Sequence, residues 1–289
     1  MQYATVSFYD RFVGMTVNFY SQIQYIYEKG LDMAKKTEAG KRKWYFKALK
    51  KVMKIRYKKP EFIYLDGENI KEGSIILSNH EGTDAPMAFE IYHNSKFRMW
   101  GAHEMNSGLI ELYKYQTKVY YHEKKHWNIH LARVFCLVAS PLTNLFYSGL
   151  NLISTYKDNR FVKTVKESYN TLKNGENIII YPEDSTNGYL AELEGFHAGF
   201  ALLCEYCSRK GLDVPIYVTY FKKKENIYII DKPVMYSELS ARENSKEKIA
   251  KALCDRCNEL GKMSFDSLSK DTECENEPVD AEEQVSVEG

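Results

Sequence analysis

Residues 74–86 read SIILSNHEGTDAP, and this stretch decides how the chain folds. Ile75, Ile76 and Leu77 form a short, continuous apolar run, which is typical of a strand buried on both faces. A proline follows at residue 86, where it fits the first turn of a helix. The stretch therefore predicts a buried strand that ends in a polar loop and leads into a helix.

The same alternation continues along the chain. Short β-branched or aromatic runs predict strands at residues 62–65, 74–78, 97–101, 152–156, 177–181, 214–220 and 226–230. Helical patterns are expected at 84–92, 161–173, 196–209 and 244–260, the last with Asn244 as N-cap and Glu247 completing a capping box. This order predicts an α/β fold with a single domain, whose central, mostly parallel mixed sheet is covered by helices.

Two amphipathic helices are expected before this domain. Apolar residues recur at helical spacing within residues 7–31 and 41–58, and the second stretch is densely basic. We therefore divide the chain into membrane-surface helices at residues 1–60, a domain at 61–262, and an acidic, disordered tail at 263–289.

Composition restricts the class of protein. Hydrophobic residues make up 44% of the chain and charged residues 27%, so a sizeable core can form. The sequence has no Gly-x-Ser-x-Gly elbow and no glycine-rich nucleotide loop.

Residues 1–10 lack the features of a signal peptide, so reduced thiols and an intracellular location are expected. The most apolar stretch, 131–153, is broken by Arg133, Pro141 and other polar residues, and no membrane span is predicted.

Two C-x-x-C pairs raise the question of a metal site. They are formed by Cys204 with Cys207 and by Cys254 with Cys257. Such pairs can hold zinc, but both fall inside helical patterns and lack the glycine-rich knuckle of a zinc ribbon. Buried core cysteines are the favoured interpretation, and we expect neither a metal nor a cofactor.

The loop after the quoted strand carries a candidate catalytic pair, His80 and Asp84. Active sites of open α/β sheets gather beyond the carboxyl ends of the strands. A carboxylate beside an imidazole fixes its tautomer and stabilises its cation, as a general base near neutral pH requires. A strand-end histidine with Asp84 as a helix cap is the structural alternative, and it is favoured when this motif is taken alone.

Three further stretches mark other strand ends. Residues 175–188, GENIIIYPEDSTNG, run from a buried strand into a polar cluster that contains Glu183, Asp184, Ser185 and Thr186. Lys157 follows the predicted strand 152–156 and suits a phosphate as a point charge, while Pro215 opens the strand 214–220. An ordinary capped turn and a solvated surface lysine are the structural alternatives for the first two.

Together and in this order, these motifs resemble those of the glycerolipid acyltransferase family, which contains bacterial 1-acylglycerol-3-phosphate acyltransferase. The family motifs Asn-His-x4-Asp, Gly-x-Ile-x-Val-x-Arg, Phe-Pro-Glu-Gly-Thr-Arg-Ser and Val-Pro-Val are similar to residues 79–84, 149–157, 181–187 and 214–217. The resemblance covers roughly residues 61–231 and implies an α/β acyltransferase domain.

The resemblance implies transfer of a fatty acyl group from acyl-CoA or acyl-carrier protein to a hydroxyl of a lysophospholipid-like acceptor, with 1-acyl-sn-glycerol 3-phosphate as the default. It implies that His80 is the general base and Asp84 orients it. The implied substrate-binding residues are Lys157, Glu183, Asp184, Ser185, Thr186 and Pro215. The implied partners are the lipid acceptor, the acyl carrier and an anionic membrane surface, with peripheral attachment on the cytoplasmic face and no nucleic acid.

The sequence departs from the family pattern at several positions. Three residues rather than four separate His80 from Asp84, so the loop must re-aim one side chain. Asp184 stands where the family has glycine, while Thr186 and Lys157 stand where it has arginine, which loses bidentate recognition of a phosphate.

Residues 106–138 are an apparent insertion, expected to form helices that lie on the membrane or line an acyl groove. Two alternatives stay open: a lipid-binding relative that has lost catalysis, and an acyltransferase with a non-phosphate acceptor.

Overall fold

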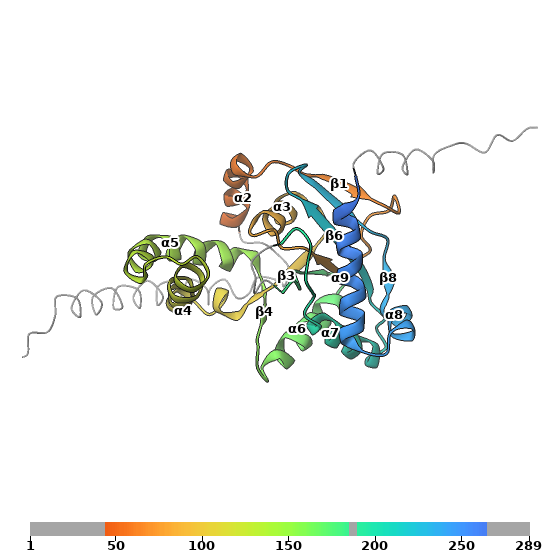
Figure 1. Ribbon diagram of the computed structural model, residues 1–289. Helices are drawn as coiled ribbons and strands as arrows, with labels where there is room; N and C mark the ends of the chain where they lie inside the picture. The colour runs from red at the N-terminus through yellow and green to blue at the C-terminus, as the bar shows by residue number, and fades with distance from the viewer. Residues whose placement is uncertain (1–43, 185–189, 265–289) are drawn as a thin grey trace, which may run out of the picture.

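The computed structural model describes residues 44–184 and 190–264. Within these ranges the chain forms an α/β fold, in which helices cover both faces of a mixed, mostly parallel sheet (Figure 1). The predicted fold class is thereby confirmed. The helix predicted at residues 7–31 and nearly all of the predicted acidic tail lie outside the described residues.

The sheet has eight strands among the described residues, in the order β1-β7-β6-β2-β5-β3-β4, with β8 paired to β6. Their bounds are β1 Glu61–Tyr64, β2 Ile75–Ser78, β3 Phe97–Ala102, β4 Ile153–Thr155, β5 Asn177–Ile180, β6 Pro215–Lys222, β7 Ile227–Ile230 and β8 Val234–Met235. The pairs made by β6 with β7 and with β8 are antiparallel, and the other pairs are parallel. Strand β8 was not predicted.

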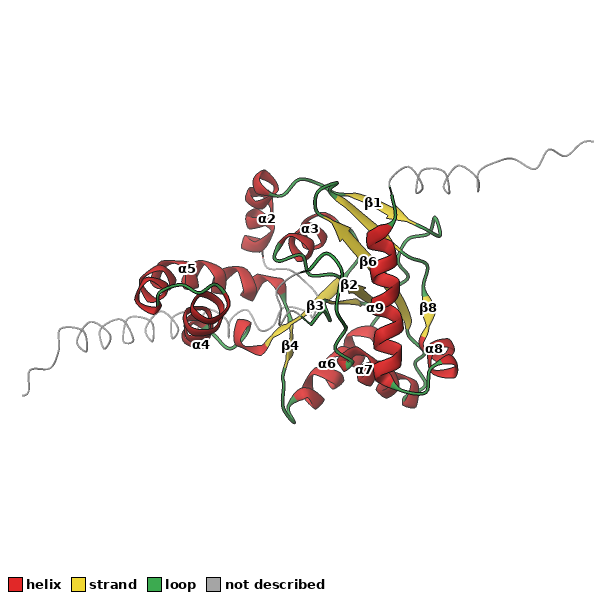
Figure 2. Cartoon of the chain, viewed as in Figure 1, coloured by secondary structure: helices red, strands yellow, loops and turns green. Residues whose placement is uncertain are grey.

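The helices cover the two faces separately (Figure 2). Their bounds are α2 Trp44–Arg56, α3 Asp84–Tyr92, α4 Leu109–Tyr115, α5 Ile129–Leu150, α6 Phe161–Lys173, α7 Gly199–Arg209, α8 Tyr236–Arg242 and α9 Lys246–Lys262. On one face Ile75, Leu77 and Ile178 pack with residues of α6, α7, α8 and α9. On the other face Ile76 and Ile179 pack with residues of α2 and α3. Alternate residues of each central strand thus enter opposite cores, which explains their continuous apolar runs.

Two predicted helix starts were wrong for identifiable reasons. Helix α7 begins at Gly199 rather than at 196, because Phe196 forms a β-bridge with Glu183. Helix α9 begins after Ser245, whose hydroxyl accepts a hydrogen bond from the N–H of Lys248 at 3.2 Å. The predicted cap at the preceding asparagine was therefore one residue too early. Helix α8 was not predicted.

The region of the apparent insertion is helical. The 3-10 helix η1 His103–Met105 directly precedes it, and it contains α4, the π-helix η2 Gln116–Lys124 and the first part of α5. Helix α5 is continuous over 22 residues despite Pro141 in its interior, and Asn128 caps its first turn by accepting from two backbone N–H groups. Among the described residues it is long and apolar enough to cross a membrane. Polar residues interrupt the apolar run, as expected, but the helix itself continues through Arg133 and Pro141.

Helix α2 is fixed to the rest of the fold at two places. Its Phe46 is fully buried and lies over Gly149 at the end of α5, where a Cβ atom would stand only 2.3 Å from the Phe46 ring. Its Lys50 forms an ion pair of 2.7 Å with Glu90 of α3, whose side chain is 1% exposed. A buried carboxylate is costly unless it is paired, so this ion pair helps to hold α2 against α3.

The four cysteines of the C-x-x-C pairs are buried in the core between α7 and α9. Burial raises the pKa of Cys207 to about 12 and that of Cys254 to about 11, and it raises those of the other two thiols as well. Within residues 44–184 and 190–264, no group of three His, Cys, Asp or Glu residues is arranged to hold a metal ion. This arrangement is that of core packing residues.

Replacing all four by alanine is expected to lower stability and release no metal. Each truncation removes a buried sulfur, and we expect a loss on the order of 1 kcal/mol per site. Thermal unfolding measures the stability loss, and metal analysis of both purified proteins measures zinc. Stoichiometric zinc in the wild type that disappears in the quadruple variant would contradict this interpretation.

Candidate functional site at the carboxyl edge of the sheet

The loops after β2, β5 and β4 lie at the same edge of the sheet, because β2, β5, β3 and β4 are neighbours that all run parallel. The loop 79–83 follows β2, and residues 181–184 follow β5, its direct neighbour. Strand β6 is also parallel to β2, so the residues after Lys222 reach the same edge. The structure thus brings together most of the strand ends that the sequence singled out.

Asn79 fixes the start of the β2 loop. Its side-chain amide donates to the carbonyl of Phe221 at 3.1 Å, and its carbonyl oxygen accepts from the Phe221 N–H at 2.7 Å. Asn79 is 1% exposed, so both of its polar ends are satisfied inside the protein. The amide acts as an extra peptide unit that continues the β2–β6 ladder by one step, and this fixes the backbone just before His80.

Glu183 holds the same loop from the other side. Its Oε2 atom accepts a hydrogen bond from the backbone N–H of His80 at 2.9 Å. Glu183 is 7% exposed, and burial raises the pKa of its carboxyl group, whereas the N–H groups of His80 and Leu190 act in the opposite direction. The carboxylate therefore positions the His80 backbone and ties the β5 loop to the β2 loop.

The His80 ring lies beside the half-buried Tyr181, with the ring centroids 5.1 Å apart. After His80 the chain turns sharply, because Glu81 and Gly82 both have positive φ, at 40° and 66°. Asp84 then begins α3. This left-handed turn is how the shortened loop passes from β2 into the helix.

Asp84 has a cationic partner that the sequence analysis missed. Its Oδ2 atom forms an ion pair of 2.7 Å with the Nζ atom of Lys223, and this contact raises the pKa of Lys223. The available signal was the run of three lysines at 222–224, which follows a strand parallel and adjacent to β2. Lys223 brings a positive charge to the loop that contains His80. The orienting contact between Asp84 and His80 stays a prediction.

The other predicted site residues are dispersed. Asp184 donates its backbone N–H to the Gly195 carbonyl at 3.0 Å, while Ser185 and Thr186 lie outside the described residues. Lys157 follows β4, three strands from β2 and therefore about 14 Å to the side.

Pro215 is not brought to this edge. It is the first residue of β6, and the next residue, Ile216, pairs with Ile75 at the beginning of β2. His80 therefore lies about 20 Å away along the strands. Its predicted place in the substrate-binding set does not fit this register, because the β6 residues that reach the His80 loop are those at its other end.

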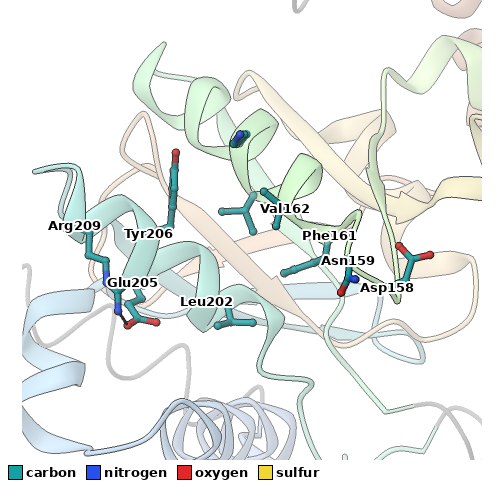
Figure 3. Close-up of a pocket in the computed structure, with 10 residues that line it drawn as sticks. Asp158, Asn159, Phe161, Val162, Leu202, Glu205, Tyr206 and Arg209 are labelled. Atoms are coloured by element: carbon teal, nitrogen blue, oxygen red, sulfur yellow. Dashed lines mark hydrogen bonds and ion pairs between the residues drawn. The ribbon is translucent and has the colours of Figure 1, made fainter.

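A shallow apolar groove lies away from the His80 loop, between α6 and α7 (Figure 3). Its volume is about 310 Å³, and its lining includes Phe161, Val162, Leu202 and Tyr206. Asp158 also lines the groove, and hydrogen bonds from Arg160 lower the pKa of its carboxyl to about 2. Neither His80 nor Glu183 lines the groove, so it is separate from the candidate site.

A similarity to known proteins is found in structure rather than in sequence. No family model matches the chain, and no curated protein matches it in sequence. Among solved structures, the chain is similar to the crystal structure of the 1-acyl-sn-glycerophosphate (LPA) acyltransferase PlsC from Thermotoga maritima. The two sequences are 13% identical, the TM-score is 0.46, and the match covers 86% of this chain and 95% of that one.

Glu183→Gln is expected to change how stability depends on pH. Because burial raises the folded-state pKa of Glu183, ionisation of this group opposes folding. The stability of the wild type should therefore fall, relative to the variant, as pH rises from below about 4.5 through the raised pKa. Urea unfolding of both proteins between about pH 4 and pH 8 measures this difference. A difference that is constant across the range would contradict the assignment.

Proposed function

We propose that this protein is an O-acyltransferase that moves a fatty acyl group from a thioester carrier to a hydroxyl of a lysophospholipid-like acceptor. The observation that carries the proposal is the fixation of His80. The Asn79 side chain fixes the backbone just before His80, and Glu183 accepts a hydrogen bond from the His80 N–H, so the backbone of a half-buried histidine is held at the carboxyl edge of a parallel sheet. A general base needs such a fixed position relative to its substrate.

In the proposed reaction, His80 takes the proton of the acceptor hydroxyl. The oxygen then attacks the thioester carbonyl, and the resulting tetrahedral intermediate collapses to an ester as the carbon–sulfur bond breaks. The imidazolium returns its proton to the leaving thiolate, so protons balance and His80 is regenerated. Asp84 is proposed to orient the ring and stabilise its cation.

The ion pair between Lys223 and Asp84 supports a second candidate, a lipid-binding protein without catalytic activity. A lysine 2.7 Å from this carboxylate offsets the negative charge that an imidazolium at His80 requires. Under the catalytic proposal, the bound acceptor draws Lys223 away from Asp84. The two candidates differ in whether any acyl transfer occurs.

His80→Ala is expected to lower transfer by about 10²–10⁴-fold, because the general base is lost. Asp84→Asn should have a smaller effect, since an amide can still contact the ring but cannot stabilise its charge. The assay uses labelled acyl-CoA and acyl-carrier protein with a panel of lyso-lipids, on variants whose fold is checked by circular dichroism. His130→Ala, a change at an exposed histidine of α5, is the matched control.

Full activity in His80→Ala would rule out the proposed base. Wild-type protein that binds lyso-lipids and transfers no acyl group from either donor would establish the non-catalytic candidate.

We further propose that Lys223, rather than Lys157, binds a phosphate on the acceptor. Lys223 directly follows β6, the strand next to β2, whereas Lys157 follows β4, three strands away. With lysophosphatidic acid, Lys223→Ala should raise KM about tenfold, the loss expected for one charged hydrogen bond. Lys223→Arg should retain most of the affinity for lysophosphatidic acid. With monoacylglycerol, which has no phosphate, Lys223→Ala should change KM little. A larger effect of Lys157→Ala, or equal effects on both acceptors, would contradict this assignment.

A further inference from the structure

Helix α5 exposes a continuous apolar stripe. Its members are Leu131, Val134, Phe135, Val138, Leu142 and Leu145. Their spacing of mostly three or four residues puts them on one face of the helix. Val138 is 72% exposed and Leu142 66% exposed. An exposed apolar patch of this extent marks an interaction surface, because leaving it in water is unfavourable.

The opposite face of α5 is already occupied. Ala132, Cys136, Ser140 and Asn144 recur every four residues and are buried. The hydroxyl of Ser140 donates to the side chain of Gln116 in η2 at 2.7 Å. The exposed stripe is therefore a second, separate face of the helix.

The surroundings of the stripe are basic and aromatic. Helix α5 contains one charged residue, Arg133, and no Asp or Glu. At its carboxyl end it packs against α2, where the hydroxyl groups of Tyr45 and Ser148 lie 2.7 Å apart. Helix α2 has five Lys or Arg residues and no Asp or Glu, and its Val52 and Ile55 are also exposed.

At the other end of α5, the rings of Tyr121 and Trp127 lie 4.8 Å apart and both contact Phe135. Tyrosine and tryptophan favour the interface between lipid headgroups and acyl chains. An apolar stripe with interfacial aromatics at one end and cations at the other complements an anionic phospholipid bilayer in both polarity and charge.

We propose that α5 lies in the plane of an anionic bilayer, with its exposed stripe among the acyl chains. This goes beyond acyl transfer, since it states which surface of the protein meets lipid and in what orientation. Figure 1 shows α4 and α5 projecting from one side of the sheet, where a bilayer can reach them.

The geometry favours an in-plane helix over one that spans the membrane. At 22 residues, α5 is about 33 Å long and could cross a hydrocarbon core. However, it packs along α4 and η2, whose exposed faces include Glu111, Lys114 and Lys118. A crossing would take these charges into hydrocarbon, which is costly. An in-plane position leaves them in water.

The binding test uses the full chain and vesicles of phosphatidylcholine with or without phosphatidylglycerol. Val138→Glu and Leu142→Glu should each lower partitioning onto anionic vesicles by about tenfold or more. Each change puts a charge where an apolar side chain would enter the bilayer. Val162→Glu, at an exposed apolar residue of α6, is the matched control and should bind as the wild type does. His80→Ala should also bind normally, which separates this test from that of the proposed acyl transfer.

Unchanged binding in both stripe variants would overturn the proposal. In that case, a loss of stability in both variants would show that another part of the chain covers the stripe. Conversion of a dimer to a monomer would show that a second copy of the chain covers it.

The orientation is tested by labelling vesicle-bound protein with a membrane-impermeant maleimide, in a Cys274→Ser background. In-plane binding predicts that His126→Cys reacts and Val138→Cys is protected. Protection of His126→Cys, or reaction of Val138→Cys, would overturn the in-plane orientation.

Discussion

The candidate site depends on the two hydrogen bonds between the Asn79 side chain and the backbone of Phe221. The β2–β6 ladder runs to the end of β2 at Ser78, and the side-chain amide continues it where the chain must leave the sheet. Because Asn79 is buried, its amide would be costly to leave without partners. The loop therefore begins from a fixed point, and the positions of His80, the left-handed turn and the start of α3 all follow from it.

The elements that could be predicted are those with a local signal. Every residue of strands β2 and β5 is buried, and their apolar runs predicted a sheet covered on both faces. Helix α9 was located well, but its start was displaced because Asn and Ser are both good caps and only backbone geometry separates them. Helix α5 passes through Pro141, where tertiary packing overrides the local preference.

The features of the site that could not be predicted depend on register between distant segments. The pairing of Ile75 with Ile216 puts Pro215 at one edge of the sheet and Lys223 at the other, and no local pattern contains this information. The role of Glu183 was missed for the same reason. In sequence it looks like an ordinary loop acid, and only the pairing of β5 with β2 brings its carboxylate to the His80 N–H.

The ion pair between Lys50 and Glu90 has a mechanical consequence. Its carboxylate is almost completely enclosed, so losing the lysine would be costly, and the pair links α2 to α3. Helix α3 begins with Asp84, and α2 carries the basic surface next to α5. This one pair thus connects the helix that carries the basic surface to the helix whose first residue lies beside the candidate site.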